Sequence, residues 1–169
     1  METILASDPA RISIRIPIWL WRRVVIQLRR HGKVESESGA FLLGPQDDTF
    51  DRVTAFICYD DLDANAYQGG AIAFHAAGHA ALWEHCRKNE LRVVADVHTH
   101  PGWNVGQSPI DKRNPMMPVQ GHTAIIVPNF GNTSWWSLER AGIHEYLGNF
   151  EWRGHTLSRG KRRVRLTMW

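Results

Sequence analysis

The segment DVHTHPGWNVGQSPID (residues 96–111) carries side chains whose types and spacing are suited to binding a metal ion. His98 and His100 fall in an apolar run that predicts a strand, and residues two apart in a strand point to the same side. Asp111 follows eleven residues later. Two imidazoles and one carboxylate are three protein ligands, the usual number for a catalytic zinc ion that keeps its fourth position for water. These three side chains are therefore candidate ligands for one catalytic zinc ion.

The tetrapeptide SPID at the end of this segment is also typical of the start of a helix. Ser108 is the expected N-cap, Pro109 the first helical residue, and Asp111 stands in a capping-box position. Backbone N–H groups at a helix start orient a carboxylate, so the structural and the chemical interpretations are compatible. If the Ser108 hydroxyl faces a reacting carbonyl, we expect it not to cap the helix fully.

A His-x-His pair on a strand is weak evidence by itself, because hydrogen-bonded or solvent-facing histidines are more common than ligands. Pro101 and Gly102 strengthen it, since they end the strand directly after His100 and begin a loop, where catalytic groups usually gather. No further cysteine or histidine stands at a convincing spacing for a fourth ligand. For His75 and His122 we expect surface or core roles.

A zinc hydrolase also needs a general base beside the reacting water. Glu37 is the candidate, because it precedes the apolar segment SGAFLLG, which should pack as a strand near the strand of His98. A solvated glutamate in a turn is the simpler interpretation of Glu37, and Glu35 is an alternative base.

The elements that must position these groups are mostly strands. Alternating or apolar patterns predict strands at residues 12–17, 37–44, 52–59, 71–75, 91–100 and 122–128, with further short strands at 134–140, 142–148 and 163–169. Helices are predicted around an apolar face formed by Trp21, Val24, Val25 and Leu28, ending near Gly32, and at residues 80–89. We therefore expect one α/β (α+β) domain over residues 1–169, with helices packed on a sheet in which the strand of His98 is central.

The segment HTHPGWNVGQSPID, with its proline after the second histidine, resembles the motif of the JAMM (MPN-type) zinc metalloproteases, and ESGAFLLG resembles their upstream glutamate strand. The resemblance implies a mixed central sheet packed by two or three helices in a three-layer, cytidine-deaminase-like arrangement. It also implies that His98, His100 and Asp111 bind zinc, that Glu37 activates water, and that Ser108 stabilises the oxyanion.

The resemblance covers roughly residues 37–129. One departure is Ala40, which stands where the eukaryotic members of the family often have glycine, while Gly39 beside it is kept. No catalytic atom changes, but the register of Glu37 depends on this strand.

Enzymes of this family typically cut peptide or isopeptide bonds after the C-terminal glycine of a ubiquitin-like protein. The short domain resembles the bacterial branch, whose members are encoded with ubiquitin-like, E1-like and E2-like partners, some in antiviral defence. The resemblance thus implies a deubiquitinase-like isopeptidase. Trp103, in the loop after the histidines, is a candidate wall for the extended tail of the modifier.

Three alternatives remain open at this point: a protease for a ubiquitin-like sulfur carrier, a non-catalytic module that binds ubiquitin-like proteins, and a nucleic-acid binder. The last rests on the basic run RGKRRVR near the end of the sequence and on a net charge of +3. Its residues alternate with apolar ones as in a charged edge strand, which usually serves to prevent aggregation. Nucleic acid is therefore not the expected partner.

Composition places the chain among ordinary globular proteins, with 43% hydrophobic residues in 169. The two cysteines lie far apart, so a disulfide framework is not expected. The sequence shows neither an apolar run of membrane-spanning length nor a signal-peptide pattern. We expect a cytoplasmic protein that does not enter a membrane.

Overall fold

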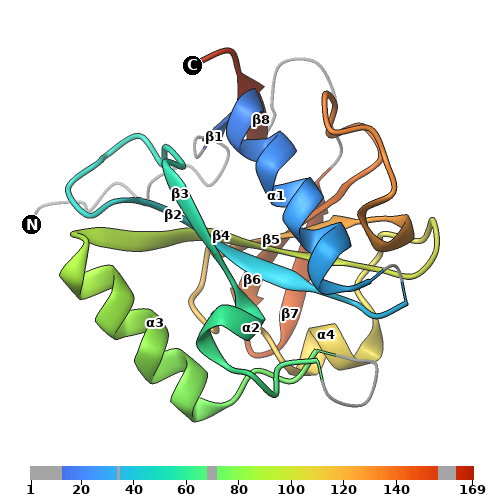
Figure 1. Cartoon of the computed structure of the whole chain (residues 1–169), viewed down its shortest axis with the longest axis horizontal. Helices are drawn as coiled ribbons and strands as arrows, with labels where there is room; N and C mark the ends of the chain where they lie inside the picture. The colour runs from blue at the N-terminus through green and yellow to red at the C-terminus, as the bar shows by residue number, and fades with distance from the viewer. Residues whose placement is uncertain (1–12, 34, 68–71, 156–162) are drawn as a thin grey trace, which may run out of the picture.

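The computed structural model describes residues 13–33, 35–67, 72–155 and 163–169 and shows a mixed α/β fold (Figure 1). Along the chain the elements are β1 (Ile14–Pro17), α1 (Ile18–His31), β2 (Gly39–Pro45), β3 (Ala55–Cys58), α2 (Tyr59–Leu62), α3 (Ala76–Lys88), β4 (Leu91–Thr99), α4 (Pro109–Arg113), β5 (Thr123–Val127), the 3-10 turn η2 (Asn129–Gly131), β6 (Gly142–Gly148), β7 (Glu151–His155) and β8 (Val164–Thr167).

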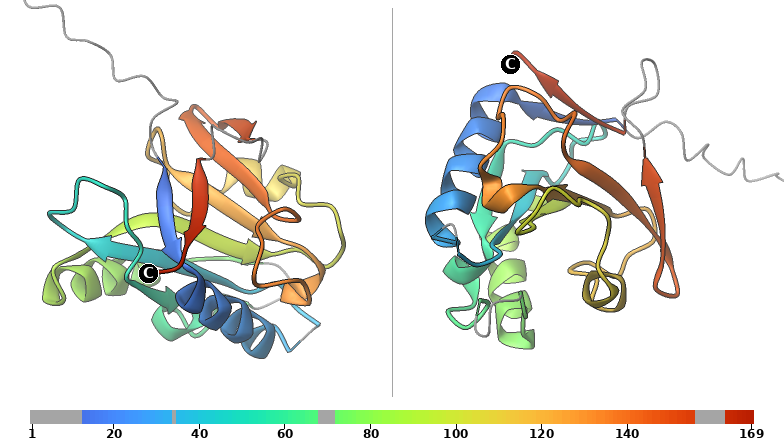
Figure 2. Two further views of the ribbon diagram at one scale, coloured as in Figure 1. Left: turned by 90° about the horizontal axis from the view of Figure 1, so that it is seen from above. Right: turned by 90° about the vertical axis from the view of Figure 1, so that its right-hand side faces the viewer.

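Six strands form one mixed sheet in the order β3-β2-β4-β5-β6-β7. β4 pairs antiparallel with β2 and parallel with β5, so the central position predicted for it is confirmed. The first and last described strands, β1 and β8, pair in parallel as a separate two-stranded sheet. The beginning and the end of the described chain therefore lie side by side (Figure 2).

Helices cover the sheet and make the three layers, with α1 above the strands and α3 below them in Figure 1. Ala40 and Leu42 of β2 belong to the core cluster that contains α1, whereas Phe41 and Leu43 pack in a second cluster with Leu82 of α3. Alternate residues of a strand face opposite sides, so β2 is buried on both. The predicted fold class, a mixed sheet packed by helices in three layers, is confirmed.

The first helix follows its predicted pattern. α1 buries the four residues of the predicted apolar face, Trp21, Val24, Val25 and Leu28. Gly32 is the C-cap of the helix, as predicted, and only glycine fits there, because a Cβ would lie 2.3 Å from the Ser36 carbonyl oxygen.

Two predicted strands are wrong, and one strand was not predicted. Residues 72–75 and 134–140 form no strand. The ring centroid of Phe74 lies 5.2 Å from that of Phe41, against the apolar core. Arg22 lies over the ring of Trp135, 5.2 Å from its centroid. β7 was not predicted, because it is an edge strand whose residues are largely exposed and polar and show no apolar pattern. The strands predicted at 12–17 and 71–75 begin at residues 12 and 71, which lie outside the described residues.

Among the described residues, no helix combines the length and the hydropathy that crossing a bilayer requires.

We expect Gly39→Ala to destabilise the fold. The added methyl would lie 2.2 Å from the ring of the fully buried Tyr59, and overpacking of this kind costs about 1–3 kcal/mol. Gly102→Ala is the matched control, because nothing lies within 4 Å of its Cβ position. Urea unfolding measures both variants; a Gly39→Ala variant as stable as the control would contradict the tight packing.

Candidate metal centre

The three candidate ligands meet in the structure. The Nε2 atoms of His98 and His100 lie 3.3 Å apart. Asp111 approaches both, with Oδ2 at 3.2 Å from His100 Nε2 and Oδ1 at 3.6 Å from His98 Nε2. Both imidazoles are buried, with 6% and 7% of each residue exposed. The three donor atoms therefore converge on one point at the end of β4.

Hydrogen bonding on the far side of His100 prepares its Nε2 atom as a ligand. Its Nδ1 atom lies 2.9 Å from the carbonyl oxygen of Asn104, which can only accept. Nδ1 therefore carries a proton, which leaves Nε2, the atom that faces His98 and Asp111, as the ligand atom. Metal-bound histidines in proteins are commonly held in this way.

His98 has a carboxylate behind it. Asp96 stands two residues earlier on the same face of β4, with Oδ2 4.0 Å from His98 Nδ1. Asp96 is itself buried and held by the His122 ring at 2.7 Å and by the Tyr59 hydroxyl, which donates to it at 3.1 Å. Asp96 thus places a fixed negative charge next to the side of His98 that faces away from Asp111.

Asp111 is oriented by the helix start predicted from SPID. The Ser108 side chain accepts from the Asp111 backbone N–H at 3.1 Å, and the Ser108 backbone N–H donates to Asp111 Oδ2 at 2.7 Å. This capping box is complete, so the expectation that Ser108 does not cap fully is wrong. The cap uses the acceptor side of the hydroxyl oxygen, and the same side chain hydrogen-bonds to the Asp111 carboxylate and helps to lower its pKa.

Glu37 lies beside the two histidines because of the pairing of β2 with β4. Its neighbour Ser38 donates its backbone N–H to Thr99 Oγ1 at 3.0 Å and accepts from the Thr99 N–H at 2.9 Å. Thr99 separates His98 from His100 in the chain. Burial raises the pKa of Glu37 above its ordinary value, opposed by the positive charges of the two histidines and reinforced by Asp111. The alternative base, Glu35, is exposed.

Opposite charges within the triad shift the pKa values of its members. Burial disfavours the charged form of His98, but hydrogen bonds and charges from Asp111 and Asp96 outweigh it and raise the pKa of His98 to about 9. Burial likewise opposes ionisation of Asp111, yet its contacts with His100 and His98 hold the pKa of Asp111 well below the usual range. The centre is therefore built to keep a carboxylate charged next to a positive charge.

The residues present fit a zinc ion. Two imidazole nitrogens and one carboxylate oxygen within 4.8 Å of one another are a donor set that zinc accepts, with a position left for water. Asp111 retains the charge that a cation requires, and two of the three ligands are held by further hydrogen bonds. The structure therefore contains a candidate metal-binding triad of His98, His100 and Asp111.

A small hollow opens beside the triad. It is lined by His98 and Asp111 on one side and by apolar side chains that include Ile72, Ile110 and Met116 on the other. Its volume is about 20 Å³, which is room for one water molecule. A wider hollow of about 410 Å³ is lined in part by the same three apolar residues.

Trp103 does not line either hollow. It is 58% exposed, and Arg140 lies over its ring at 5.1 Å from the centroid. Its role as a wall for a bound tail stays a prediction. Trp152, which sequence reasoning did not single out, lines the small hollow instead.

Sequence reasoning also missed Asp96 and His144. The signal for Asp96 was its position two residues before His98, which puts both on one face of the strand. His144 had no local signal: it comes from β6, and its Nε2 donates to the Val105 carbonyl at 2.8 Å, next to the loop that follows the histidines. Burial lowers the pKa of His144, consistent with a neutral ring.

His75 and His122 lie outside the triad, as expected. His75 pairs with Asp63 at 2.6 Å and is largely exposed, whereas His122 is buried against Asp96. His75 is thus a surface residue, and His122 supports the site from within the core.

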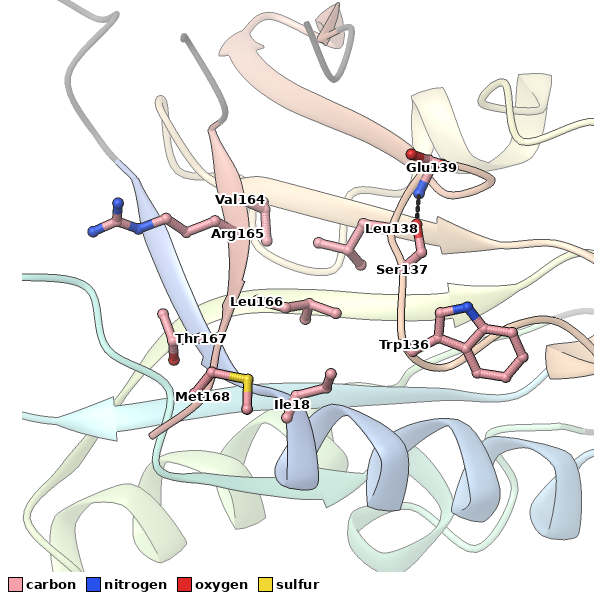
Figure 3. A pocket seen from close by; sticks show the side chains of 10 residues that line it. All are labelled: Ile18, Trp136, Ser137, Leu138, Glu139, Val164, Arg165, Leu166, Thr167 and Met168. Carbon is pink, nitrogen blue, oxygen red and sulfur yellow. Dashed lines mark hydrogen bonds between the residues drawn. The ribbon is translucent and has the colours of Figure 1, made fainter. Parts of the chain in front are cut away.

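A different hollow, of about 280 Å³, lies between β8, the start of α1 and residues 136–139 (Figure 3). Leu138 and Leu166 point into it, and the Glu139 backbone N–H donates to the Ser137 hydroxyl at 3.1 Å on its rim. No histidine or cysteine is among the residues that line it. The triad, and not this hollow, is therefore the candidate site for metal chemistry.

Comparison with known proteins shows the fold. No protein-family model matches the chain. A protein from Desulfitobacterium hafniense, solved in solution, is 18% identical with a TM-score of 0.60, covering 91% of this chain and 92% of its own. A solution structure from Salinibacter ruber is 18% identical with a TM-score of 0.53, over 88% and 94%. At this identity both establish a shared fold and nothing about activity.

A crystal structure from Archaeoglobus fulgidus is also similar, at 16% identity and a TM-score of 0.47, over 90% of this chain and 97% of that one. That protein is described as a JAB1/MPN domain protein.

We expect Asp96→Asn to lower the free energy of unfolding by about 3 kcal/mol, because it leaves the buried His122 without its carboxylate partner. Burial raises the pKa of Asp96, but the His122 and His98 contacts outweigh it and lower that pKa from 3.8 to about 2. A pKa lowered by folding stabilises the fold above the unfolded value and loses that contribution as the pH falls through the folded value.

The stability gap between wild type and Asp96→Asn should therefore be full at pH 7 and shrink between about pH 4 and pH 2. Urea unfolding of the metal-free protein at each pH measures it. Asp47→Asn, at an exposed position, serves as the control. An unchanged gap at acid pH would show that the charge of Asp96 is not what stabilises the site.

Proposed function

We propose that the protein is a zinc-dependent peptidase of the MPN/JAMM type, which cleaves after the C-terminal glycine of a ubiquitin-like protein. The observation that carries this proposal is the convergence of His98, His100 and Asp111 on one point with Glu37 beside them. The complete motif supports the family, and the confirmed three-layer fold is compatible with it.

Zinc held by the triad would supply Lewis acidity and lower the pKa of water. Glu37, whose pKa is raised by burial, is suited to accept a proton from that water and later pass it to the leaving amine. The cap does not use the hydroxyl proton of Ser108, and we assign that proton to the oxygen of the scissile carbonyl, in exchange for its contact with the Asp111 carboxylate. The capping box thus lets one side chain orient Asp111 and still donate to substrate.

The two adjoining hollows support an extended substrate. The small one beside the triad admits little more than one water molecule, whereas the wider one is lined by Ile110 and Met116, which also line the small one. A narrow approach favours a flexible, glycine-rich tail over a folded segment. Trp103 remains the proposed wall on the side of the loop after the histidines.

The proposal includes the ubiquitin-like protein as substrate, E1-like and E2-like proteins as pathway partners, and a cytoplasmic role in bacterial conjugation, with antiviral defence as one setting. Processing of a sulfur carrier uses the same tail and the same site, so it remains a variant of the proposal. A non-catalytic binding module is the alternative outside the enzymes.

The basic run near the end of the sequence gives little support to nucleic-acid binding. Arg163 is buried, donates to Thr123 Oγ1 at 2.7 Å, and pairs with Glu145 at 3.3 Å. It is therefore committed to the protein interior. Residues 159, 161 and 162 of the run lie outside the described residues.

The test of the function uses a ubiquitin-like protein fused through its terminal glycine to a reporter. We expect cleavage at that glycine by the zinc-loaded protein, loss of cleavage in a chelator, and recovery when zinc is restored. Cleavage that continues in the chelator would contradict the metal mechanism. Tail binding without any cleavage would favour the binding module.

We expect Glu37→Gln to lower cleavage by at least a hundredfold while zinc content and stability stay near wild type, because the amide cannot accept the proton. Glu35→Gln is the matched control, since Glu35 is two residues away and exposed. Full activity of Glu37→Gln together with loss in Glu35→Gln would reassign the base.

For Ser108, we separate capping from catalysis with two substitutions. Ser108→Ala should cost about 1 kcal/mol of stability, whereas Ser108→Gly should cost only a few tenths, because glycine is tolerated at an N-cap. Both should lose about 10²–10³ in kcat, the typical cost of one oxyanion donor. Normal kcat in the glycine variant would limit Ser108 to its cap.

A further inference from the structure

A second group of metal-type donors lies outside the candidate centre, where three elements end or begin. His31 is the last residue of α1, Cys58 the last of β3, and Asp60 lies in the first turn of α2. One donor atom from each lies within 4.8 Å of the others. His31 is 27 residues from Cys58 and 29 residues from Asp60 in the sequence, so only the tertiary fold brings it to the other two.

The contacts within this group are close. His31 Nδ1 lies 2.7 Å and 2.5 Å from the two carboxylate oxygens of Asp60. Cys58 is buried, with 2% of the residue exposed, whereas the side chains of His31 and Asp60 remain 23% and 28% exposed. A cation can therefore reach the group from solvent and meet a sulfur atom at its inner side.

An ion pair between His31 and Asp60 accounts for two members of the group, and Cys58 adds a buried thiol that also belongs to the core cluster that contains α1. Burial first, and then the charges of Asp61 and Asp60, raise the pKa of Cys58 to about 12. The second cysteine of the chain, Cys86, lies in the apolar cluster under α3 and has no such neighbours among its contacts.

We propose that His31, Cys58 and Asp60 form a second metal site, which binds a divalent cation of the zinc type and ties the end of α1 to the β3–α2 junction. Sulfur, imidazole and carboxylate together are a donor set that zinc accepts and that magnesium and calcium do not prefer.

Binding at this site is balanced in protons. Cys58 loses its thiol proton to solvent and binds as thiolate. The Nδ1 proton that His31 donates to Asp60 is also given up, so that His31 binds through Nδ1 with its ring proton on Nε2, and the carboxylate of Asp60 is already charged. Metal uptake should therefore release protons and strengthen as the pH rises.

The position of the site gives it a structural role. Tyr59, between Cys58 and Asp60, donates to Asp96 behind His98. The Tyr67 hydroxyl lies beside Asp60 and also bonds to both the N–H and the carbonyl of Gly39, two residues after Glu37. A cation at this junction would hold in place the two tyrosines that support the candidate catalytic residues.

Cobalt provides a test that separates this site from the candidate centre. Co²⁺ is titrated into reduced, metal-free protein, and the near-ultraviolet charge-transfer band of a cobalt–thiolate bond is recorded. The triad has no sulfur ligand, so it cannot give this band. We expect the band in wild type and in His98→Ala/His100→Ala, and its loss in Cys58→Ser.

Cys86→Ser is the matched control and should keep the band. Zinc analysis should give two ions per chain in wild type, one in His98→Ala/His100→Ala and one in Cys58→Ser. A wild type without the band, or a Cys58→Ser variant that retains it, would overturn the proposal. If the proposed peptidase centre alone is wrong, the histidine variant keeps the zinc content of wild type while Cys58→Ser still loses one ion.

His31→Gln covers the case in which Cys58→Ser does not fold. It removes a partly exposed ligand and leaves both cysteines intact, so circular dichroism should report a native fold. We expect at least a tenfold weaker cobalt affinity, read from the same band. Wild-type affinity in this variant would also overturn the proposal.

Discussion

The pairing of β2 with β4 is the constraint on which the candidate centre depends. In this antiparallel register Gly39 is opposite His98, and Ser38 and Thr99 exchange hydrogen bonds just beyond it. A slip of one residue would turn the side chains of β2 to the opposite face. The register thus decides that Glu37, and no other carboxylate of the loop after α1, arrives beside the two histidines. It also explains why Ala40 is tolerated: its methyl faces the α1 cluster, away from the site.

Buried charge is the main cost of this arrangement, and the structure offsets it with paired groups. Asp96, His122 and His98 form a connected polar group inside the core, and Tyr59 adds a hydroxyl to it. Isolated, each charge would be strongly destabilising. Paired, they fix the position of His98 from behind, as Asn104 fixes that of His100. The candidate ligands are therefore held before any metal binds, which lowers the entropic cost of binding.

The parts of the fold and of the candidate centre that have a local signal could be predicted from the sequence. The helix α1 follows from its apolar spacing, the cap at Ser108 from four residues, and the shared face of His98 and His100 from the period of a strand. The predictions that were wrong or missing concern features that depend on contacts between residues far apart in the sequence. The segment 72–75 is apolar enough for a strand, but its Phe74 is used to fill the core against Phe41. Asp96 gains its role from His122 and Tyr59, which are 26 and 37 residues away.

The same limit applies to Ser108. The sequence made the cap and the catalytic role compatible, but it predicted that a Ser108 hydroxyl facing a reacting carbonyl would not cap the helix fully. The structure shows that capping occupies only a lone pair of the oxygen. Donor and acceptor capacities of a hydroxyl are separate, so the two roles are compatible, and only atomic geometry could show it.

Anomalous diffraction at the zinc absorption edge, from crystals of the zinc-loaded protein, tests the central claim most directly. The account predicts a peak at about 2.0–2.2 Å from Nε2 of His98, Nε2 of His100 and a carboxylate oxygen of Asp111. A zinc-loaded crystal with no peak between these three side chains would contradict it.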